Sequence, residues 1–403
     1  MSINNILCLP DMLRGTRAFP EGFFDLIREP IRQGCDIDIG LSPESTITPA
    51  FGNFVIDEFK RLVGSNSENK DEVWRQTFIS LPSPALAYFH QHLPSDCLVL
   101  SFEMPPWLEA ALNERSVPFI DIRVSPLRFG RDLYIALRTN DDSLQTCIAQ
   151  HQITEEELRL EASYLAANVS MHQQRLVESD RAMLSLDNAM VFIGQAPYDA
   201  SLIKADGKIV GFGDYREQIR ALIQGRRLLY KPHPFALWFA EEERNLLREI
   251  TGKDVENCQL NAYQILSSKE EVELIGLCSG LLQEARWFNK KSHSLYHAFT
   301  PIAVEANDKS GYRQVHFHRW LSPGFWHGLL TPEAPAPKLM EVPPLAHHHA
   351  RHTIDQWWDY LKVLTWEKAH SYESFERAGG AVLRTRMDQL EAKTMALPPE
   401  FKD

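Results

Sequence analysis

The sequence predicts an α/β fold with two Rossmann-like halves and C-terminal helices that cross back over them. In both halves of the chain, short apolar runs typical of buried strands alternate with helical patterns. In the second half these runs end in small, polar or charged residues just before a helix. A chain of 403 residues has a prior of two or three domains. We therefore expect an N-terminal unit over 1–185, a second unit over 186–345 and C-terminal helices over 346–403.

Composition excludes several classes of protein. Lys and Arg number 42 against 54 Asp and Glu, a net charge of -12 that argues against general nucleic-acid binding. The six cysteines form no CxxC pair and are interpreted as reduced thiols. No stretch approaches the roughly 20 apolar residues that a membrane helix needs. We expect a cytoplasmic protein that meets any lipid-linked substrate at a membrane surface.

A βαβ unit is predicted around residue 100. Two apolar runs, at 98–102 and 117–122, flank a helical stretch at 107–115, which is the spacing of parallel strands joined by a helix. Glu103 directly follows the first run, and Asp121 lies near the end of the second. Both carboxylates are therefore placed at strand ends, where parallel sheets present their functional groups.

The second half repeats the strand–helix alternation. A long helix over 154–176, begun by Thr154 as a cap, is expected to lead into it. Strands are then expected at 189–193, 228–230 and 272–277, each followed by a loop and a helix.

Six prolines in 322–345 predict an extended connector. One apolar helical stripe is expected after it, made of Ile354, Trp357, Trp358, Leu361 and Leu364.

Polar residues collect at the ends of the three second-half strands. In chain order the candidates are Gln195, Asp199, Ser201, Lys231, His233, Ser279, Gly280 and Glu284. Because the carboxyl ends of parallel strands share one edge, we expect these residues to converge on a ligand. Lys231 and His233 suit a phosphate, and a helix that begins at 279–280 favours an anion. Structural alternatives stay open: His233 as a turn residue between prolines, and Ser279 as an ordinary helix cap.

The order of these motifs resembles that of a known enzyme group. GQ…DASL, KPHP, a Tyr-x-x-Leu-Ser helix at 263–267 and CSG…EA follow one another as in bacterial capsule-polysaccharide transferases. More narrowly, they resemble the β-Kdo glycosyltransferases, whose hallmark includes a Gln-x-x-x-Asp-x-Ser loop and a His-Pro motif. The similarity is best over 185–300 and weaker over 95–135. It implies a GT-B fold, in which two Rossmann-like domains face a central cleft and the second mainly holds the sugar nucleotide.

The resemblance also implies a mechanism. Such enzymes are retaining and use CMP-β-Kdo, and Asp199 matches the acid that would form the covalent intermediate of a double displacement. Its structural alternative is to cap the following turn. His233 and Lys231 would stabilise the departing phosphate. CMP leaves as a monophosphate, so no cofactor and no obligatory metal are expected.

A second acid or base must take the proton of the acceptor hydroxyl. Asp121 and Glu103 are the candidates, and Asp121 is preferred. Arg123, Arg128 and Arg131 would engage the Kdo carboxylate or an anionic acceptor.

The implied partners are a CMP-sugar donor, a glycan or lipid-linked acceptor, and a glycan-assembly complex at the inner face of the bacterial inner membrane. No nucleic acid is expected. Two alternatives stay open. One is a related capsule or lipopolysaccharide transferase that uses another nucleotide sugar. The other is a catalytically silent GT-B subunit that scaffolds glycan assembly.

Overall fold

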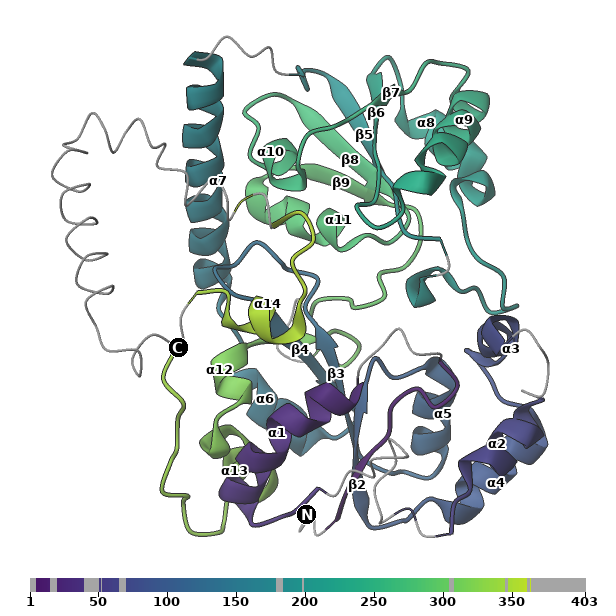
Figure 1. Cartoon of the computed structure of the whole chain (residues 1–403), viewed down its shortest axis with the longest axis vertical. Coiled ribbons are helices and arrows are strands. Elements are labelled where there is room, and N and C mark those ends of the chain that lie inside the picture. Colours follow the sequence, from purple (N-terminus) through teal and green to yellow (C-terminus); the bar gives the residue numbers. More distant parts are fainter. Residues whose placement is uncertain are drawn as a thin grey trace, which may run out of the picture.

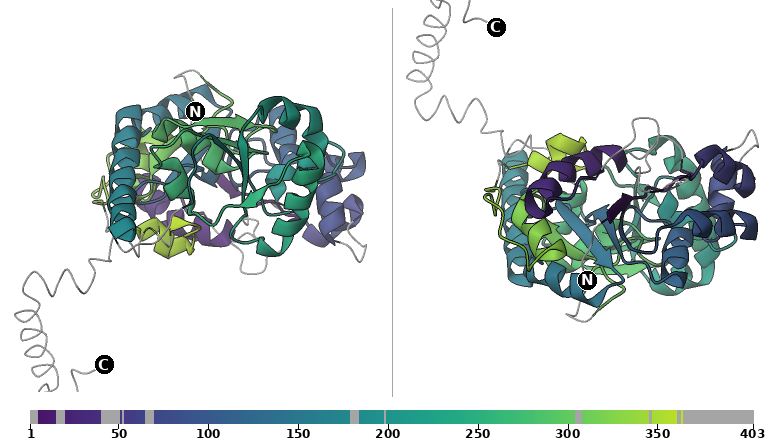
Figure 2. Two further views of the ribbon diagram at one scale, coloured as in Figure 1. Left: turned by 90° about the horizontal axis from the view of Figure 1, so that it is seen from above. Right: turned by 90° about the horizontal axis from the view of Figure 1, so that it is seen from below.

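The chain folds around two five-stranded sheets, which lie one above the other in Figure 1. The structure is a computed structural model that describes residues 5–14, 20–39, 51, 53–64, 70–178, 184–197, 199–303, 308–344, 347–360 and 363. Views from above and below show helices on both sides of the sheets (Figure 2). The predicted α/β class with two Rossmann-like units is confirmed. No helix within these ranges combines the length and apolar character needed to cross a membrane.

The second sheet has the strand order of a Rossmann fold. Its parallel strands are β5 (Ala189–Ile193), β6 (Arg227–Lys231), β7 (Glu256–Asn257), β8 (Val272–Gly276) and β9 (Lys291–Ser294). They lie in the order β7-β6-β5-β8-β9, so the direction in which strands are added reverses between β5 and β8. Open α/β sheets bind ligands beside the carboxyl ends of the strands at such a switch point. The loops after β5, β6 and β8 are therefore the expected site.

Helices cover this sheet because its central strands, β5, β6 and β8, are buried on both faces. On one face lie α7 (Glu155–Glu178), α10 (Ala262–Leu266) and α11 (Gly280–Glu284). On the other lie α8 (Arg216–Leu222) and α9 (Ala240–Thr251). Val191 of β5 shares a core with Leu165 of α7, and its neighbour Phe192 shares the opposite core with Leu247 of α9. The long helix predicted over 154–176 is α7, and the hydroxyl of Thr154 accepts a hydrogen bond from the Glu157 N–H at 3.2 Å.

The first sheet is mixed. Its strands are β1 (Asn5–Cys8), β2 (Cys97–Phe102), β3 (Phe119–Val124), β4 (Tyr134–Thr139) and β10 (Arg313–His316), in the order β1-β2-β3-β4-β10. The first three are parallel, and β4 is antiparallel to both of its neighbours. The predicted βαβ unit is present as β2, α5 (Pro106–Glu114) and β3. Strand β10 comes from the range assigned above to the second unit, so the chain returns to the first sheet well before residue 345.

Neighbouring side chains along the strands of the first sheet pack into two different cores, one on each face of the sheet. One face is covered by α2 (Ile56–Val63), α4 (Ser83–His92) and α5. The other is covered by α1 (Pro20–Cys35), α6 (Asp142–Gln150), α12 (Phe317–Trp320) and α13 (Pro323–Leu330). Val99 of β2 shares a core with Phe89 of α4, whereas its neighbour Leu100 shares one with Trp326 of α13. Helix α3 (Lys70–Thr77) brings Trp74 into a small cluster with residues of the second unit.

The C-terminal part differs from two predictions. The first is the extended connector, part of which is the helix α13. Pro323 lies in the first turn of α13, where its missing N–H is not needed, and Trp326 is fully buried. The second is the apolar stripe, because helix α14 (His349–Ile354) ends before Trp357. Asp355 has a φ of 50°, a left-handed conformation that stops the helix. Residues 361 and 364 of the stripe lie outside the described ranges.

Candidate active site

The loops that follow β5 and β8 are hydrogen-bonded to each other at the switch point. The Gln195 side chain accepts from the Cys278 N–H at 2.8 Å, and its amide nitrogen lies 3.3 Å from Cys278 Sγ. The same nitrogen lies 3.5 Å from Ser201 Oγ. The Cys278 thiol also donates to the Ser201 carbonyl at 3.4 Å, so Gln195 and Ser201, both predicted to face a ligand, hold the two loops together in the structure.

Asp199 lies exposed on the loop after β5. Its Oδ1 accepts from the Ser201 N–H at 2.9 Å and caps the single helical turn at 200–202. Its Oδ2 makes no hydrogen bond to the described residues. Its charge acts on the pKa values of Arg14, Arg128 and His233, which come from both units. The predicted cap is present, and it leaves one carboxylate oxygen available.

His233 follows β6 in the KPHP loop and is largely buried. Its Nδ1 accepts from the Phe235 N–H at 3.2 Å, so the neutral ring carries its proton on Nε2. Burial lowers the pKa of His233 to about 4, and the positive charge of Arg128 adds to this effect. At neutral pH the ring therefore offers an uncharged Nε2–H donor instead of a positive charge.

Lys231 ends β6 and already has an anionic partner. Its Nζ lies 2.8 Å from Oδ2 of Asp359, and both side chains are mostly buried. The same oxygen accepts from the Ala262 N–H at 2.9 Å. The charge of Lys231 is therefore balanced within the chain.

Arg128 is a partly buried cation between the two units. Its Nε is buried without a hydrogen-bond partner, and its guanidinium makes no ion pair with the described residues. The Cζ atom lies 3.5 Å from the ring centroid of Trp358. Burial lowers the pKa of Arg128. Because an unpaired buried polar group is costly, this guanidinium marks a place where an anionic ligand would compensate it.

The residues around α11 have largely structural contacts. Ser279 Oγ accepts from the Leu281 N–H at 3.4 Å, which is the helix-cap alternative. A Cβ on Gly280 would lie 3.2 Å from the carbonyl oxygen of Pro126, so glycine allows the first unit to approach closely. Glu284 accepts from the Arg128 N–H at 2.5 Å, and burial raises its pKa to about 7.

Asp121 is enclosed in the first unit. Its Oδ1 accepts from the Met104 N–H at 3.0 Å, and its Oδ2 accepts from Arg123 Nε at 3.0 Å and from the Tyr312 hydroxyl. Arg123 also donates to the Phe299 carbonyl at 2.5 Å. Both charged side chains are thus buried and paired with each other.

Glu103 is the partly exposed carboxylate of the two acid–base candidates. It forms an ion pair with Arg14, whose pKa is also influenced by Asp199. Its φ of 50° is unusual for a residue other than glycine, and such strain is often found at functional sites. Of the two predicted acid–base candidates, Glu103 is therefore the accessible one. Arg131 is engaged outside this cluster, because its Nε donates to Glu161 of α7 at 2.7 Å.

Three residues of the cluster were missed by sequence reasoning. Arg14 follows β1, a strand that the sequence analysis did not single out. Trp358 and Asp359 lie in the segment predicted to be an apolar stripe. The acidic Asp359 between Trp358 and Tyr360 could have indicated a polar contact in this segment. It was not recognised, because a single charged residue beside an apolar stripe is common on amphipathic helices.

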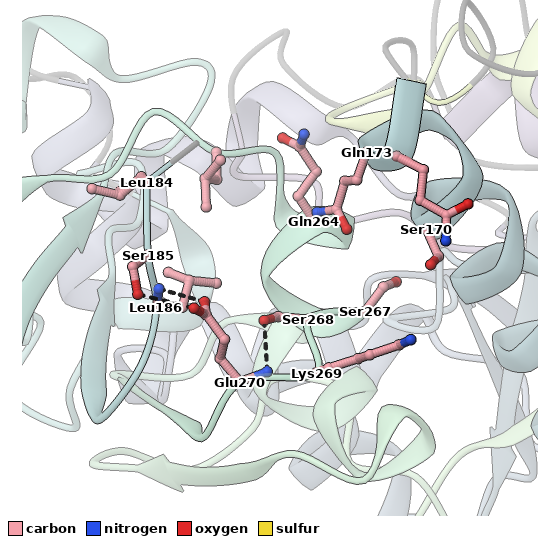
Figure 3. A pocket seen from close by; sticks show the side chains of 12 residues that line it. Ser170, Gln173, Leu184, Ser185, Leu186, Gln264, Ser267, Ser268, Lys269 and Glu270 are labelled. Carbon is pink, nitrogen blue, oxygen red and sulfur yellow. Dashed lines mark hydrogen bonds between the residues drawn. The ribbon is translucent and has the colours of Figure 1, made fainter. Parts of the chain in front are cut away.

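A separate pocket of about 600 Å³ opens beside α7 and α10 (Figure 3). Leu186 and Glu270, which precede β5 and β8, also line it, so it lies towards the amino ends of these strands. Glu270 holds this wall by accepting from the Leu186 N–H at 2.6 Å. None of the predicted site residues lines this pocket, and it is distinct from the cluster around Arg128.

Two solved structures are distantly similar to this chain. No family model and no curated protein matches the sequence. One similar solved structure is Thermosulfurimonas dismutans KpsC, described as a beta Kdo 2,7 transferase. It is 16% identical, the TM-score is 0.33, and the match covers 54% of this chain and 71% of that one. A second is KpsC of the same organism, described as a beta Kdo 2,4 transferase. It is 14% identical, the TM-score is 0.32, and the match covers 50% and 69%.

Proposed function

We propose that this protein is a retaining GT-B glycosyltransferase that moves Kdo from CMP-β-Kdo to a bacterial surface glycan or glycolipid. The observation that supports this proposal most strongly is Arg128 between the two units, whose buried Nε has no hydrogen-bond partner and whose charge acts on His233 and is acted on by Asp199. The order of motifs in the second half supports the choice of donor. The alternatives of another nucleotide sugar and of a silent scaffold subunit are outcomes of the tests below.

On the donor side, Arg128 and the Nε2–H of His233 would bind the phosphate of CMP-β-Kdo. The Asp199 carboxylate attacks the anomeric carbon, the bond from this carbon to the phosphate oxygen breaks, and CMP leaves with the electron pair. The fixed donors stabilise the charge that develops on the phosphate. The result is a Kdo ester on Asp199 and free CMP.

On the acceptor side, a hydroxyl oxygen attacks the same anomeric carbon and displaces the Asp199 carboxylate. Glu103 takes the hydroxyl proton, and Arg14 beside it holds the carboxylate in place. Two inversions give net retention at the anomeric carbon. This second displacement returns Asp199 to its ionised form.

The decisive experiment is intact-protein mass spectrometry with CMP-β-Kdo in the absence of acceptor. We expect an adduct of one Kdo that maps to the peptide containing Asp199. The Asp199→Asn variant should form no adduct, and the control Asp206→Asn, at an exposed carboxylate of the same unit, should form it normally. An adduct on another residue contradicts the nucleophile assignment. If the protein binds CMP but forms no free CMP from CMP-β-Kdo, the silent scaffold subunit is indicated.

A second experiment tests whether Arg128 binds the phosphate of CMP. Arg128→Gln should weaken CMP binding by roughly 10- to 100-fold, the range expected for hydrogen bonds to a charged group. Arg131→Gln is the matched control, because Arg131 is paired with Glu161 elsewhere. Equal losses in both variants, or none in Arg128→Gln, would contradict a phosphate role for Arg128. Binding of another nucleotide in preference to CMP would indicate a different donor.

A further inference from the structure

In the segment 355–360, two consecutive side chains each contact a cation of the proposed donor site. The Trp358 ring covers the guanidinium of Arg128, and Asp359 Oδ2 lies 2.8 Å from Lys231 Nζ. We propose that Asp359 is a specificity-determining residue that limits the negative charge the donor site accepts. It would favour the phosphodiester of a CMP-sugar over ligands with more phosphate groups. This inference rests on the proposed function.

Asp359 is held firmly from the second unit. The oxygen that contacts Lys231 also accepts from the Ala262 N–H at 2.9 Å. The Asp359 carbonyl accepts from Asn261 Nδ2 at 2.8 Å. The next residue, Tyr360, is buried against Tyr263, with ring centroids 5.7 Å apart. The carboxylate is therefore a fixed part of the site.

The same segment is attached to the first unit. Arg351 is fully buried and donates to the carbonyl oxygens of Arg128 at 2.6 Å and Gly130 at 2.8 Å. Its Cζ also lies 3.7 Å from the ring centroid of Tyr360. Because these contacts link Arg128 to Tyr360, the position of Asp359 is coupled to that of Arg128.

The charges around the site explain the selectivity. Lys231 is neutralised by Asp359, which leaves Arg128 as the unpaired cation among the described residues of the cluster. Glu284 acts most strongly among the carboxylates on the pKa of Arg128, and Asp199 and Glu103 act on it as well, so negative charge already surrounds this cation. A phosphodiester carries a single negative charge, so one cation is sufficient for it. Additional phosphate groups would meet the carboxylates without a compensating cation.

The test measures binding of CMP, CDP and CTP to the full chain by calorimetry. In the wild type, affinity should not increase from CMP to CTP. In Asp359→Asn, the affinity for CTP should increase roughly tenfold relative to CMP, or about 1.4 kcal/mol, because Lys231 becomes available. The amide oxygen of Asn still accepts from the Ala262 N–H. Asp187→Asn, at an exposed carboxylate just before β5, is the matched control and should leave the ratio unchanged.

A second variant keeps the test conclusive if Asp359→Asn does not fold. Lys231→Gln should lower the affinity for CTP relative to CMP, because it leaves the Asp359 carboxylate without its counter-charge beside the bound phosphates. An unchanged or higher CTP-to-CMP affinity ratio in this variant overturns the inference. An unchanged ratio in a folded Asp359→Asn also overturns it, as does loss of CMP binding there.

A different result of the same binding experiment would contradict the proposed function itself. If neither the wild type nor Asp359→Asn binds any cytidine nucleotide, the CMP-sugar donor is excluded, and this inference falls with it. If the wild type binds CMP and Asp359→Asn shows the wild-type ratio, the donor assignment stands and only the role of Asp359 is lost.

Discussion

Glu103 follows strand β2, whereas Asp121 lies inside the neighbouring parallel strand β3 and not at its end as predicted, and the surroundings of the two carboxylates differ. Glu103 is partly exposed and pairs with Arg14, whereas both oxygens of Asp121 are bonded inside the first unit. An enclosed carboxylate with Arg123 as its partner stabilises the fold but cannot easily reach an acceptor hydroxyl. Burial therefore distinguishes two carboxylates between which the sequence had favoured Asp121.

Asp121→Asn should destabilise the protein strongly, because it leaves the buried Arg123 without a counter-charge. We expect a loss of about 3–5 kcal/mol in the free energy of unfolding, measured by urea denaturation. Tyr312→Phe removes one hydrogen bond to the same carboxylate and should cost only about 1 kcal/mol. A stable Asp121→Asn protein with severely reduced turnover would restore Asp121 as the acid–base residue.

The buried His233 should make stability depend on pH. Its folded pKa of about 4 lies below the ordinary value of 6.5, so the unfolded chain binds more protons between these two pH values. Its contribution to stability is therefore present above pH 6.5 and is lost as the pH falls towards 4, with a slope of up to about 1.4 kcal/mol per pH unit. The difference between wild type and His233→Gln in urea unfolding at several pH values should show this slope. Parallel pH profiles would contradict a lowered His233 pKa.

At the scale of elements, the end of β5 depends on close packing against β6. Gly194 follows β5, and a Cβ there would lie 2.4 Å from the hydroxyl oxygen of Tyr230. That hydroxyl donates to Glu243 of α9 at 2.5 Å and is fixed in the core. Glycine at this position therefore sets how closely the Asp199 loop approaches the neighbouring strand.

Gly194→Ala should destabilise the second unit by about 1–3 kcal/mol, the usual cost of overpacking. Adding Tyr230→Phe removes the clashing oxygen and should recover part of this loss. Gly211→Ala is the control, because a Cβ there meets no atom within 4 Å. Thermal unfolding monitored by circular dichroism measures all three. Equal stability of Gly194→Ala and wild type would show that the strands separate easily.

At the scale of the whole molecule, the two units are interleaved along the chain. Strand β10 returns to the first sheet from the second unit, and α12 and α13 then complete the first core with Trp320 and Trp326. The hydrogen bond from Arg123 to the Phe299 carbonyl joins β3 to the segment that leads into β10. The first unit is therefore incomplete without residues beyond 312.

A fragment of residues 1–185 should fail to fold cooperatively. It lacks β10, which leaves the edge of β4 unpaired, and it exposes the apolar face that α12 and α13 cover. We expect an aggregating or partly folded species by circular dichroism and size-exclusion chromatography, with the full chain as control. A soluble fragment with a single sharp unfolding transition would contradict the interleaved arrangement.

Much of the second unit was determined by the sequence itself. Apolar runs at 189–193 and 228–230 and the polar loops after them are local features, and the parallel order follows from helices between the strands. The same information placed Asp199, Lys231 and His233 at one edge of a sheet. It also identified the βαβ unit of the first half, because strand, helix and strand follow one another without interruption.

Only the tertiary structure decided which of these residues are paired, buried or available. Asp121 and its partner Tyr312 are 191 residues apart, and Lys231 is neutralised by Asp359 from another distant segment. The return of β10 to the first sheet is equally remote from its partner β4. Periodicity reports which side of an element is apolar, but it carries no information about which distant segment will cover that side. The charge balance of the site, and hence the isolation of Arg128, arises only when these segments pack together.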